Sequence, residues 1–260
     1  MIAKIALCAF LSVAILTTGV SAQSALPDGA TLAWAENFDA LESARWSHGL
    51  AWGLDYDSGL QRYRPENVTV ENGALTIRAK PQASGDPARP WTSGAIHSCR
   101  KISVQYGWVF ARVRSDGLPG EWAALYLTHD TYSLYGDKDK FNTFELDLIE
   151  TQGTRPTQIL QNFHSYTPHH YTREKWSNVG NVSDWHIVGV RWSPSGVSYW
   201  IDGVKRHEVK TPVVRFPACI AIALTVGGWE RGNHPAPDYA GAFQVDWIHW
   251  YTWPNRVHAS

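Results

Sequence analysis

Three acidic side chains lie close together near the middle of the chain, in the run Glu145-Leu146-Asp147-Leu148-Ile149-Glu150. Acidic and aliphatic residues alternate at first, as on a half-buried β-strand, whose successive side chains point to opposite faces. The alternation breaks by one residue before Glu150. On a regular strand Glu150 would point into the core with Leu146 and Leu148, where an unpartnered carboxylate is costly to bury.

A β-bulge would resolve this conflict, because one extra residue returns Glu150 to the face of Glu145 and Asp147. The strand would then display three carboxyl groups in a row. Two carboxyl groups at a fixed separation are the minimal equipment for cleaving a glycosidic bond, one as nucleophile and the other as acid and then base. A third acid between them separates their titrations, so that one ionises while the other keeps its proton. Spacing alone does not say which glutamate has which role.

The alternative is an exposed strand whose acids serve only solubility. Three like charges along one edge, with no Lys or Arg between them, are unfavourable on a purely structural strand. The rest of the chain must decide between the two readings.

The start of the chain has the pattern of a secretory signal. Lys4 precedes a short apolar run, residues 5–16, and small residues follow at Val20-Ser21-Ala22. The run is too short to span a bilayer comfortably. We therefore expect a signal peptide over residues 1–22, a secreted or periplasmic protein, and a single catalytic β-sandwich domain over residues 23–260.

The bulk composition limits the partners. A net charge of −1 leaves no basic surface for nucleic acid, so we do not expect nucleic acid as a partner. We also expect no membrane partner after signal cleavage, and we expect the protein to be a monomer. The chain has 14 Trp and 11 Tyr, which either fill a core or stack on sugar rings in a cleft. Cys99 and Cys219 either form a disulfide or remain buried thiols.

Short strand-like runs separated by turn signals follow one another, and no segment shows a sustained helical period. This pattern predicts an all-β domain, either a two-sheet sandwich or a closed barrel, with tight hairpins at residues 194–196 and 202–203. The predicted strands are 74–79, 94–104, 106–114, 122–127, 144–149, 158–164, 186–192, 197–201, 204–209, 218–226 and 243–251. The strand-poor segments 46–65, 128–142, 165–182 and 227–241 are predicted to be functional loops.

In this order the motifs resemble family 16 of the glycoside hydrolases, whose signature is Glu-x-Asp-x-x-Glu on a bulged strand. The resemblance covers most of the chain after residue 22. Besides the acidic run, it rests on residues 35–39, 46, 61–63, 71–77, 93–96, 106–107, 111–113, 184–192, 199–203, 226–228 and 245–248. It implies a two-sheet antiparallel jelly-roll sandwich of the concanavalin A type. It also implies retaining endo-hydrolysis of a β-linked polysaccharide, either a β-1,3/1,4-glucan or a bacterial exopolysaccharide, with no cofactor required.

The resemblance also implies roles for single residues. Glu145 corresponds to the nucleophile, Glu150 to the acid/base and Asp147 to the assisting acid. The residues expected to contact substrate are Trp122, His164, Arg112, Trp229 and Phe110. For the tryptophans and the arginine the alternative is core or rim packing, and for His164 it is a structural histidine.

Two departures from the family pattern bear on substrate. Phe110 stands where several β-glucanase members carry a sugar-binding glutamate, and Thr143 stands where many glucanases carry a tryptophan. Both argue against a plain lichenase or laminarinase and favour bacterial members that trim exopolysaccharides. Asp246 matches an aspartate that holds a structural calcium ion in some members, or else it pairs with its sheet neighbours.

Two further functions use the same features. A lectin-like carbohydrate-binding module can be built on the same sandwich without catalysis, because a fold does not determine its function. A transglycosylase would use the same acids but favour a sugar acceptor over water.

Overall fold

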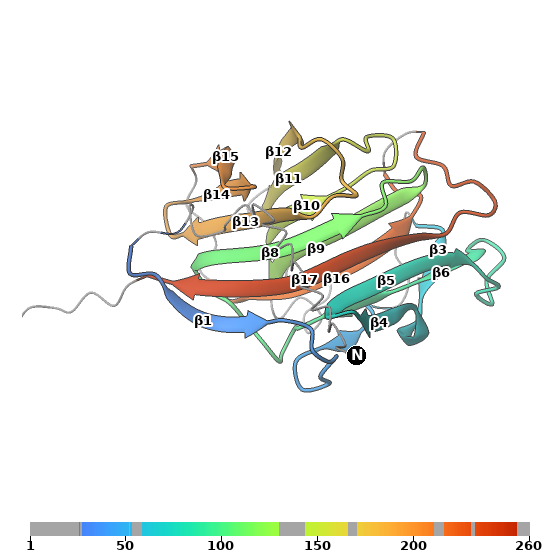
Figure 1. The fold of residues 1–260 in the computed structure, drawn as a ribbon, viewed down its shortest axis with the longest axis horizontal. Helices are drawn as coiled ribbons and strands as arrows, with labels where there is room; N and C mark the ends of the chain where they lie inside the picture. Colours follow the sequence, from blue (N-terminus) through green and yellow to red (C-terminus); the bar gives the residue numbers. More distant parts are fainter. Residues whose placement is uncertain are drawn as a thin grey trace, which may run out of the picture.

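The computed structural model describes residues 26, 28–51, 53, 59–129, 144–165, 171–210, 216–229 and 232–253. The signal segment 1–22 and Thr143 lie outside these residues, and the division into a signal peptide and one domain stays a prediction. In the described residues, strands form two layers, together with a single 3-10 turn at Pro65–Asn67 (Figure 1). No described segment forms a helix that could cross a membrane.

The larger sheet has ten strands in the described part of the chain. Eight follow the order β15-β14-β13-β8-β17-β5-β6-β3, while β1 pairs with β17 and β4 with β5. All its pairs are antiparallel except β3 with β6. The strands are β1 (Thr31–Glu36), β3 (Gln61–Tyr63), β4 (Val68–Glu71), β5 (Ala74–Pro81), β6 (Trp91–Ser93), β8 (Gly107–Ser115), β13 (His186–Ser193), β14 (Gly196–Ile201), β15 (Val204–Val209) and β17 (Gly241–Thr252).

The second sheet carries the acidic run, and its described residues form seven strands in the order β12-β11-β10-β9-β16-β7-β2. Its pairs are antiparallel throughout. The strands are β2 (Ser47–His48), β7 (Ala95–His97), β9 (Glu121–His129), β10 (Phe144–Glu150), β11 (Gln158–Ser165), β12 (Tyr171–Asn178) and β16 (Ala218–Val226). The all-β prediction is therefore confirmed, and the sandwich reading holds over the closed barrel.

The main core lies between the sheets and follows from the two-residue period of the strands. On β9, Leu125 and Leu127 enter this core, and on β16, Ile222 and Leu224 enter it from the neighbouring strand. Each such side chain contributes about 1.5–3 kcal/mol when fully buried. The alternate residues of the same strands point to the opposite face of the second sheet, where a separate apolar cluster forms. One face of this sheet thus supports the fold and leaves the other free for a site.

Most predicted strands are present with ends shifted by one or two residues. The predicted turn at residues 202–203 joins β14 to β15, and Asp202 and Gly203 have the positive φ angles, 51° and 75°, that such a tight hairpin requires. Residues 194–196 likewise join β13 to β14, since Ser193 pairs with Gly196.

Two predictions about the positions of strands and loops were wrong. The strand expected over residues 94–104 stops at His97, because Ser98 begins a tight turn in which its carbonyl oxygen accepts from Lys101 and Ile102. The loop expected over residues 165–182 contains β12, which pairs with β11 along its full length. Its Thr-Arg-Glu-Lys stretch hides the strand from a search for apolar alternation, because β12 is a mostly exposed edge strand.

The two cysteines left open by the sequence are joined. Cys99 and Cys219 are both buried and form a disulfide with an S–S distance of 2.01 Å across a sequence separation of 120 residues. The bond ties the turn after β7 to the first residues of β16, and so fastens two neighbouring strands of the second sheet.

We expect reduction of this disulfide to lower the free energy of unfolding by about 4–5 kcal/mol, because it releases a long loop in the unfolded chain. Urea unfolding with and without a reductant measures the difference. In a Cys99→Ala/Cys219→Ala variant the reductant should change nothing. Equal urea midpoints for the oxidised and reduced wild-type protein would contradict the expectation.

Candidate active site

The predicted bulge is present in β10. Asp147 lies opposite Tyr126 and Ile149 lies opposite Leu125, so Leu148 is the extra residue against β9. Leu148 and Ile149, although consecutive, both belong to the main core. Because two successive side chains enter the core, Glu150 returns to the face of Glu145 and Asp147. All three acids line one pocket on the outer face of the second sheet.

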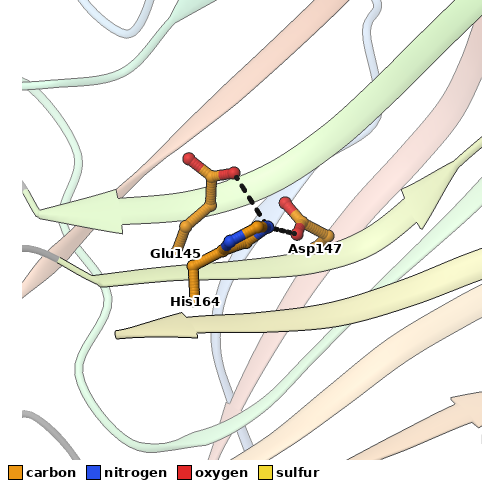
Figure 2. Close-up of side chains that lie close together, drawn as sticks. All are labelled: Glu145, Asp147 and His164. Carbon is orange, nitrogen blue, oxygen red and sulfur yellow. Dashed lines mark ion pairs between the residues drawn. The ribbon is translucent and has the colours of Figure 1, made fainter. Parts of the chain in front are cut away.

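His164 approaches two of the acids from β11. It lies opposite Glu145 in the strand register, and its Nε2 atom is 3.3 Å from Asp147 Oδ2 and 3.9 Å from Glu145 Oε1 (Figure 2). Asn162, opposite Asp147, lies within hydrogen-bond distance of the same ring nitrogen, 2.9 Å from Nδ2 to Nε2. The cross-strand pairing thus fixes the orientation of the histidine ring over the acids.

Two tryptophans contact Glu150. Trp122, near the start of β9, donates from Nε1 to Glu150 Oε1 at 2.9 Å. Trp229, in the segment after β16, also hydrogen-bonds to Glu150 and packs edge-on against Trp122, with ring centroids 6.4 Å apart. Trp229 remains 48% exposed, so its ring is open to a ligand. Of the predicted substrate contacts, the structure brings Trp122, His164 and Trp229 to the acids.

The acids hold protons near neutral pH. Burial is the largest cause that raises the pKa of Glu145 to about 8, and the neighbouring Asp147 is the next largest. Burial and the charge of Glu145 raise the pKa of Glu150 to about 7. The pKa of Asp147 is also raised well above its ordinary value, first by burial and then by Glu150. His164 opposes the rise at both glutamates. Such a cluster can keep one carboxyl protonated as an acid while another ionises.

The floor beside the acids is built from small residues that the sequence reasoning missed. Four alanines share the outer apolar cluster with three larger side chains. The alanines are Ala95, Ala124, Ala221 and Ala223, and the larger residues are Leu50, Tyr63 and Tyr126. Across this floor Tyr63 and Thr225 are hydrogen-bonded through their hydroxyl groups at 2.9 Å. The available signal was the alternation of alanine with large aliphatic residues along β16, which separates a hollow face from a filled one.

Phe110 and Arg112 require correction. Both lie on β8, in the larger sheet rather than the sheet that carries the acids. Phe110 is buried in a separate outer cluster with Trp108 and Ile187. The Arg112 guanidinium group stacks on Trp185 at 4.5 Å. Their predicted contacts with substrate are therefore wrong, because β8 belongs to the sheet that does not carry the acids.

The predicted calcium site is not supported either. Asp246 Oδ2 forms an ion pair with Arg112 Nη1 at 2.5 Å. Asp246 therefore pairs with a neighbour in its own sheet, which was the alternative to calcium binding. An arginine at this distance already neutralises the carboxylate that a calcium ion would need. The described residues do contain one set of donor atoms that could hold a metal ion, from Glu145, Asp147 and His164, within 4.8 Å of one another. Acid–base chemistry by two carboxyl groups needs no ion there.

A sandwich that presents two glutamates and an intervening aspartate from a bulged strand defines the glycoside hydrolase class of site. The model of the glycosyl hydrolases family 16 matches residues 59–249, and the chain belongs to this family.

The chain is 29% identical over 238 residues to the clotting factor G alpha subunit of Tachypleus tridentatus, covering 85% of this chain and 34% of that protein. It is 25% identical to the glucan endo-1,3-beta-glucosidase A1 of Niallia circulans, covering 86% of this chain and 38% of that protein. The chain thus spans little more than a third of these two relatives.

The fold is similar to that of the laminarinase catalytic domain from Thermotoga maritima. The TM-score is 0.78 at 21% identity, over 88% of this chain and 100% of that one. This similarity confirms the jelly-roll sandwich that the sequence resemblance implied.

The raised pKa values predict how stability depends on pH. Between the ordinary value of 4.5 and the folded value of about 8, Glu145 stays protonated in the folded state but ionises in the unfolded state. The folded state then holds more protons, so its stability falls as pH rises through this window. Glu145→Gln cannot ionise, so its stability relative to wild type should increase from pH 4.5 to 8 and then level off.

Urea unfolding of both proteins at several pH values measures this difference. Glu71→Gln is the control of opposite sign, because hydrogen bonds from Thr69 and Arg78 lower the pKa of Glu71. Its stability relative to wild type should therefore decrease as pH rises through the acid range. A difference between Glu145→Gln and wild type that does not change with pH would show that Glu145 ionises normally.

Deletion of Ile149 tests the bulge. Regular pairing would leave the final glutamate opposite Ala124, as Glu150 is now, but it would remove the local twist of the bulge and so aim the carboxyl group differently. Because catalytic groups must be placed accurately, we expect activity on any substrate of the wild type to fall by about 100-fold or more. Circular dichroism should show a retained β fold. Ile149→Val, which keeps the residue count, is the control, and a folded deletion variant with normal activity would mean that the bulge is not required.

Proposed function

We propose that this chain is a secreted retaining endo-β-glycanase that cleaves internal bonds of a β-linked polysaccharide. The observation that carries the proposal is the bulge in β10, which puts Glu145, Asp147 and Glu150 in one pocket with raised pKa values. Membership of the family supports the reaction class.

In the proposed first step Glu150 protonates the leaving glycosidic oxygen while the Glu145 carboxylate attacks the anomeric carbon. In the second step Glu150, now ionised, takes a proton from water, which attacks the same carbon and releases Glu145. His164 lowers the pKa of both glutamates, but the pKa of Glu145, about 8, stays above that of Glu150, about 7. The assignment of nucleophile and acid is therefore supported by the family pattern and not by the order of these pKa values. Asp147, buried between the glutamates, raises the pKa of Glu145 through its charge and through a hydrogen bond.

We propose a β-glucan with β-1,3 linkages as the first substrate to test, and a bacterial exopolysaccharide as the second. Similarity to a glucan endo-1,3-beta-glucosidase supports the first. The departure at Phe110 no longer argues against it, because that residue lies on the other sheet. The half-exposed ring of Trp229 offers a face on which a sugar ring can stack, and Trp122 and Tyr126 line the pocket beside the acids.

Export to the cell exterior or periplasm is part of the same proposal. The signal-like start of the chain supports it, and so does the Cys99–Cys219 disulfide, because such bonds persist mainly in oxidising compartments. We propose that the protein works as a monomer with a polysaccharide as its only partner.

A panel of soluble polysaccharides tests the function: β-1,3-glucan, mixed β-1,3/1,4-glucan, β-1,4-galactan and an acidic exopolysaccharide. We expect new reducing ends, oligosaccharides of intermediate length, and first products of β configuration by proton NMR. Binding without new reducing ends would show a lectin, and products longer than the substrate would show a transglycosylase. First products of α configuration would contradict the retaining mechanism.

Glu145→Gln and Glu150→Gln should each lower kcat by at least about 100-fold while the protein remains folded. Added azide then assigns the roles in the alanine variants, with an aryl β-oligosaccharide as substrate. In Glu145→Ala azide replaces the nucleophile and gives the α-azide after one inversion. In Glu150→Ala it attacks the glycosyl-enzyme and gives the β-azide. Glu174→Gln, on the exposed face of β12, is the control and should match wild type.

Full activity of purified Glu145→Gln would contradict the mechanism. The opposite pattern of azide products would exchange the roles of the two glutamates.

A further inference from the structure

One asparagine in the segment between β16 and β17 is almost completely buried. Asn233 lies in a stretch without strand pairing, yet only 2% of its surface is exposed. The same segment carries Trp229, which contacts Glu150. A polar side chain is buried at such a position only when its hydrogen bonds are satisfied, so its partners indicate what it holds in place.

The amide of Asn233 binds four groups from three parts of the chain. Its Oδ1 atom accepts from the backbone nitrogen of Gly120 at 2.8 Å. Its Nδ2 atom donates to the backbone oxygens of Glu121 and Gly227, at 2.8 and 2.9 Å, and to Gln152 Oε1 at 2.7 Å. One side chain therefore joins the start of β9, the end of β16 and the residues that follow β10.

Each of these partners lies next to a residue of the site. Glu121 immediately precedes Trp122, Gln152 closely follows Glu150, and Gly227 closely precedes Trp229. The three connected segments thus carry Glu150 and the two indoles that donate to it. A shift of the Asn233 amide would move these groups relative to one another.

The segment also lies directly against one of the indoles. A Cβ atom added to Gly228 would lie 2.8 Å from Trp122 Cε3, and the φ angle of Gly228 is +128°. The backbone at Gly228 is therefore in close contact with the Trp122 ring, and a larger side chain there would clash with it. The backbone nitrogen of Gly227 donates a hydrogen bond to the Gly120 carbonyl oxygen at 2.7 Å. This bond is a second link between the segment and the start of β9, besides those of Asn233.

We propose that Asn233 is a positioning residue, whose side-chain amide holds Trp122 and Trp229 in place to donate hydrogen bonds to Glu150. Asn233 does not touch the acids and acts through the two indoles. The inference deepens the proposed function and rests on it only for the catalytic consequence, because the hydrogen bonding of Glu150 can be measured in the absence of substrate.

The groups around Glu150 allow the effect to be isolated. The titratable side chains that face the same pocket are Glu145 and Asp147 on β10, Tyr126 on β9 and Tyr63 on β3, and His164 on β11 acts on Glu150 through its charge. None of them binds the Asn233 amide. Donation from both indoles favours the ionised form of Glu150. Loss of either donor should therefore raise the pKa of Glu150.

The test is Asn233→Ala in the full chain, with the pKa of Glu150 followed by carbon NMR of labelled glutamate carboxyl groups. Glu150→Gln assigns the signal. We expect the pKa to rise above the wild-type value, and kcat/KM at neutral pH to fall by about 10- to 100-fold, mainly through kcat. The alkaline limb of the pH profile should move to higher pH in parallel.

Asn67→Ala is the matched control. Asn67 is also a buried asparagine, 3% exposed, and its Nδ2 atom binds the Arg78 carbonyl oxygen at 2.8 Å, away from the pocket lining. Its loss should lower the melting temperature without moving the titration of Glu150. If Asn233→Ala only lowers the melting temperature in the same way, Asn233 is structural and the proposal is overturned.

Trp229→Phe shows whether Asn233 acts through the indoles. This variant removes a donor from a half-exposed side chain, so it should fold and should raise the pKa of Glu150 by itself. Adding Asn233→Ala to Trp229→Phe should then shift the pKa less than it does in the wild type. A full and additive shift would overturn the proposed route through Trp229.

A second variant covers the case in which Asn233→Ala does not fold. Gln152→Met keeps the length of the side chain and removes only one of the four partners, and it should give a smaller rise in the pKa of Glu150. An unchanged titration in folded Gln152→Met would then overturn the proposal. If the wild type hydrolyses no polysaccharide, the proposed function fails while these titrations still decide the role of Asn233.

Discussion

The structure depends on how β10 distributes its side chains between two faces. Leu148 and Ile149 both enter the core although they are neighbours, and this single irregularity sends Glu150 to the side of Glu145 and Asp147. A regular strand would have to bury either the glutamate or an empty space between the sheets, and both are unfavourable. The bulge lets β10 place aliphatic side chains in the core and carboxyl groups in the site at the same time. A regular strand could not do both.

The surrounding strands convert this placement into reactivity. Partial removal of the acids from water raises their pKa values, while His164 from β11 and the Trp122 indole from β9 oppose the rise. These opposing effects come from cross-strand neighbours whose positions are fixed by register. The proton affinities of the site therefore depend on several strands of the sheet. The disulfide between Cys99 and Cys219 restrains the same sheet where β7 pairs with β16.

The sequence predicted those features that are determined by residues close together in the chain. The break in alternation predicted the bulge, and turn chemistry predicted the hairpin at Asp202 and Gly203, because both depend on residues adjacent in the chain. It did not predict β12, whose polar edge residues give no apolar signal, nor the assignment of Phe110 to the larger sheet, which depends on long-range strand order. The contacts of Asn233 were equally unpredictable, since its partners are distant in sequence.

The alanine floor gives the second sheet a further property. The pocket beside the acids is lined by the methyl groups of Ala124 and Ala223, while the opposite faces of the same strands fill the core with leucine and isoleucine. Side chains on the pocket face can therefore change in size without altering the packing beneath them. Such a protein can diverge in the shape of polymer it admits while its catalytic strand and its folding remain constant.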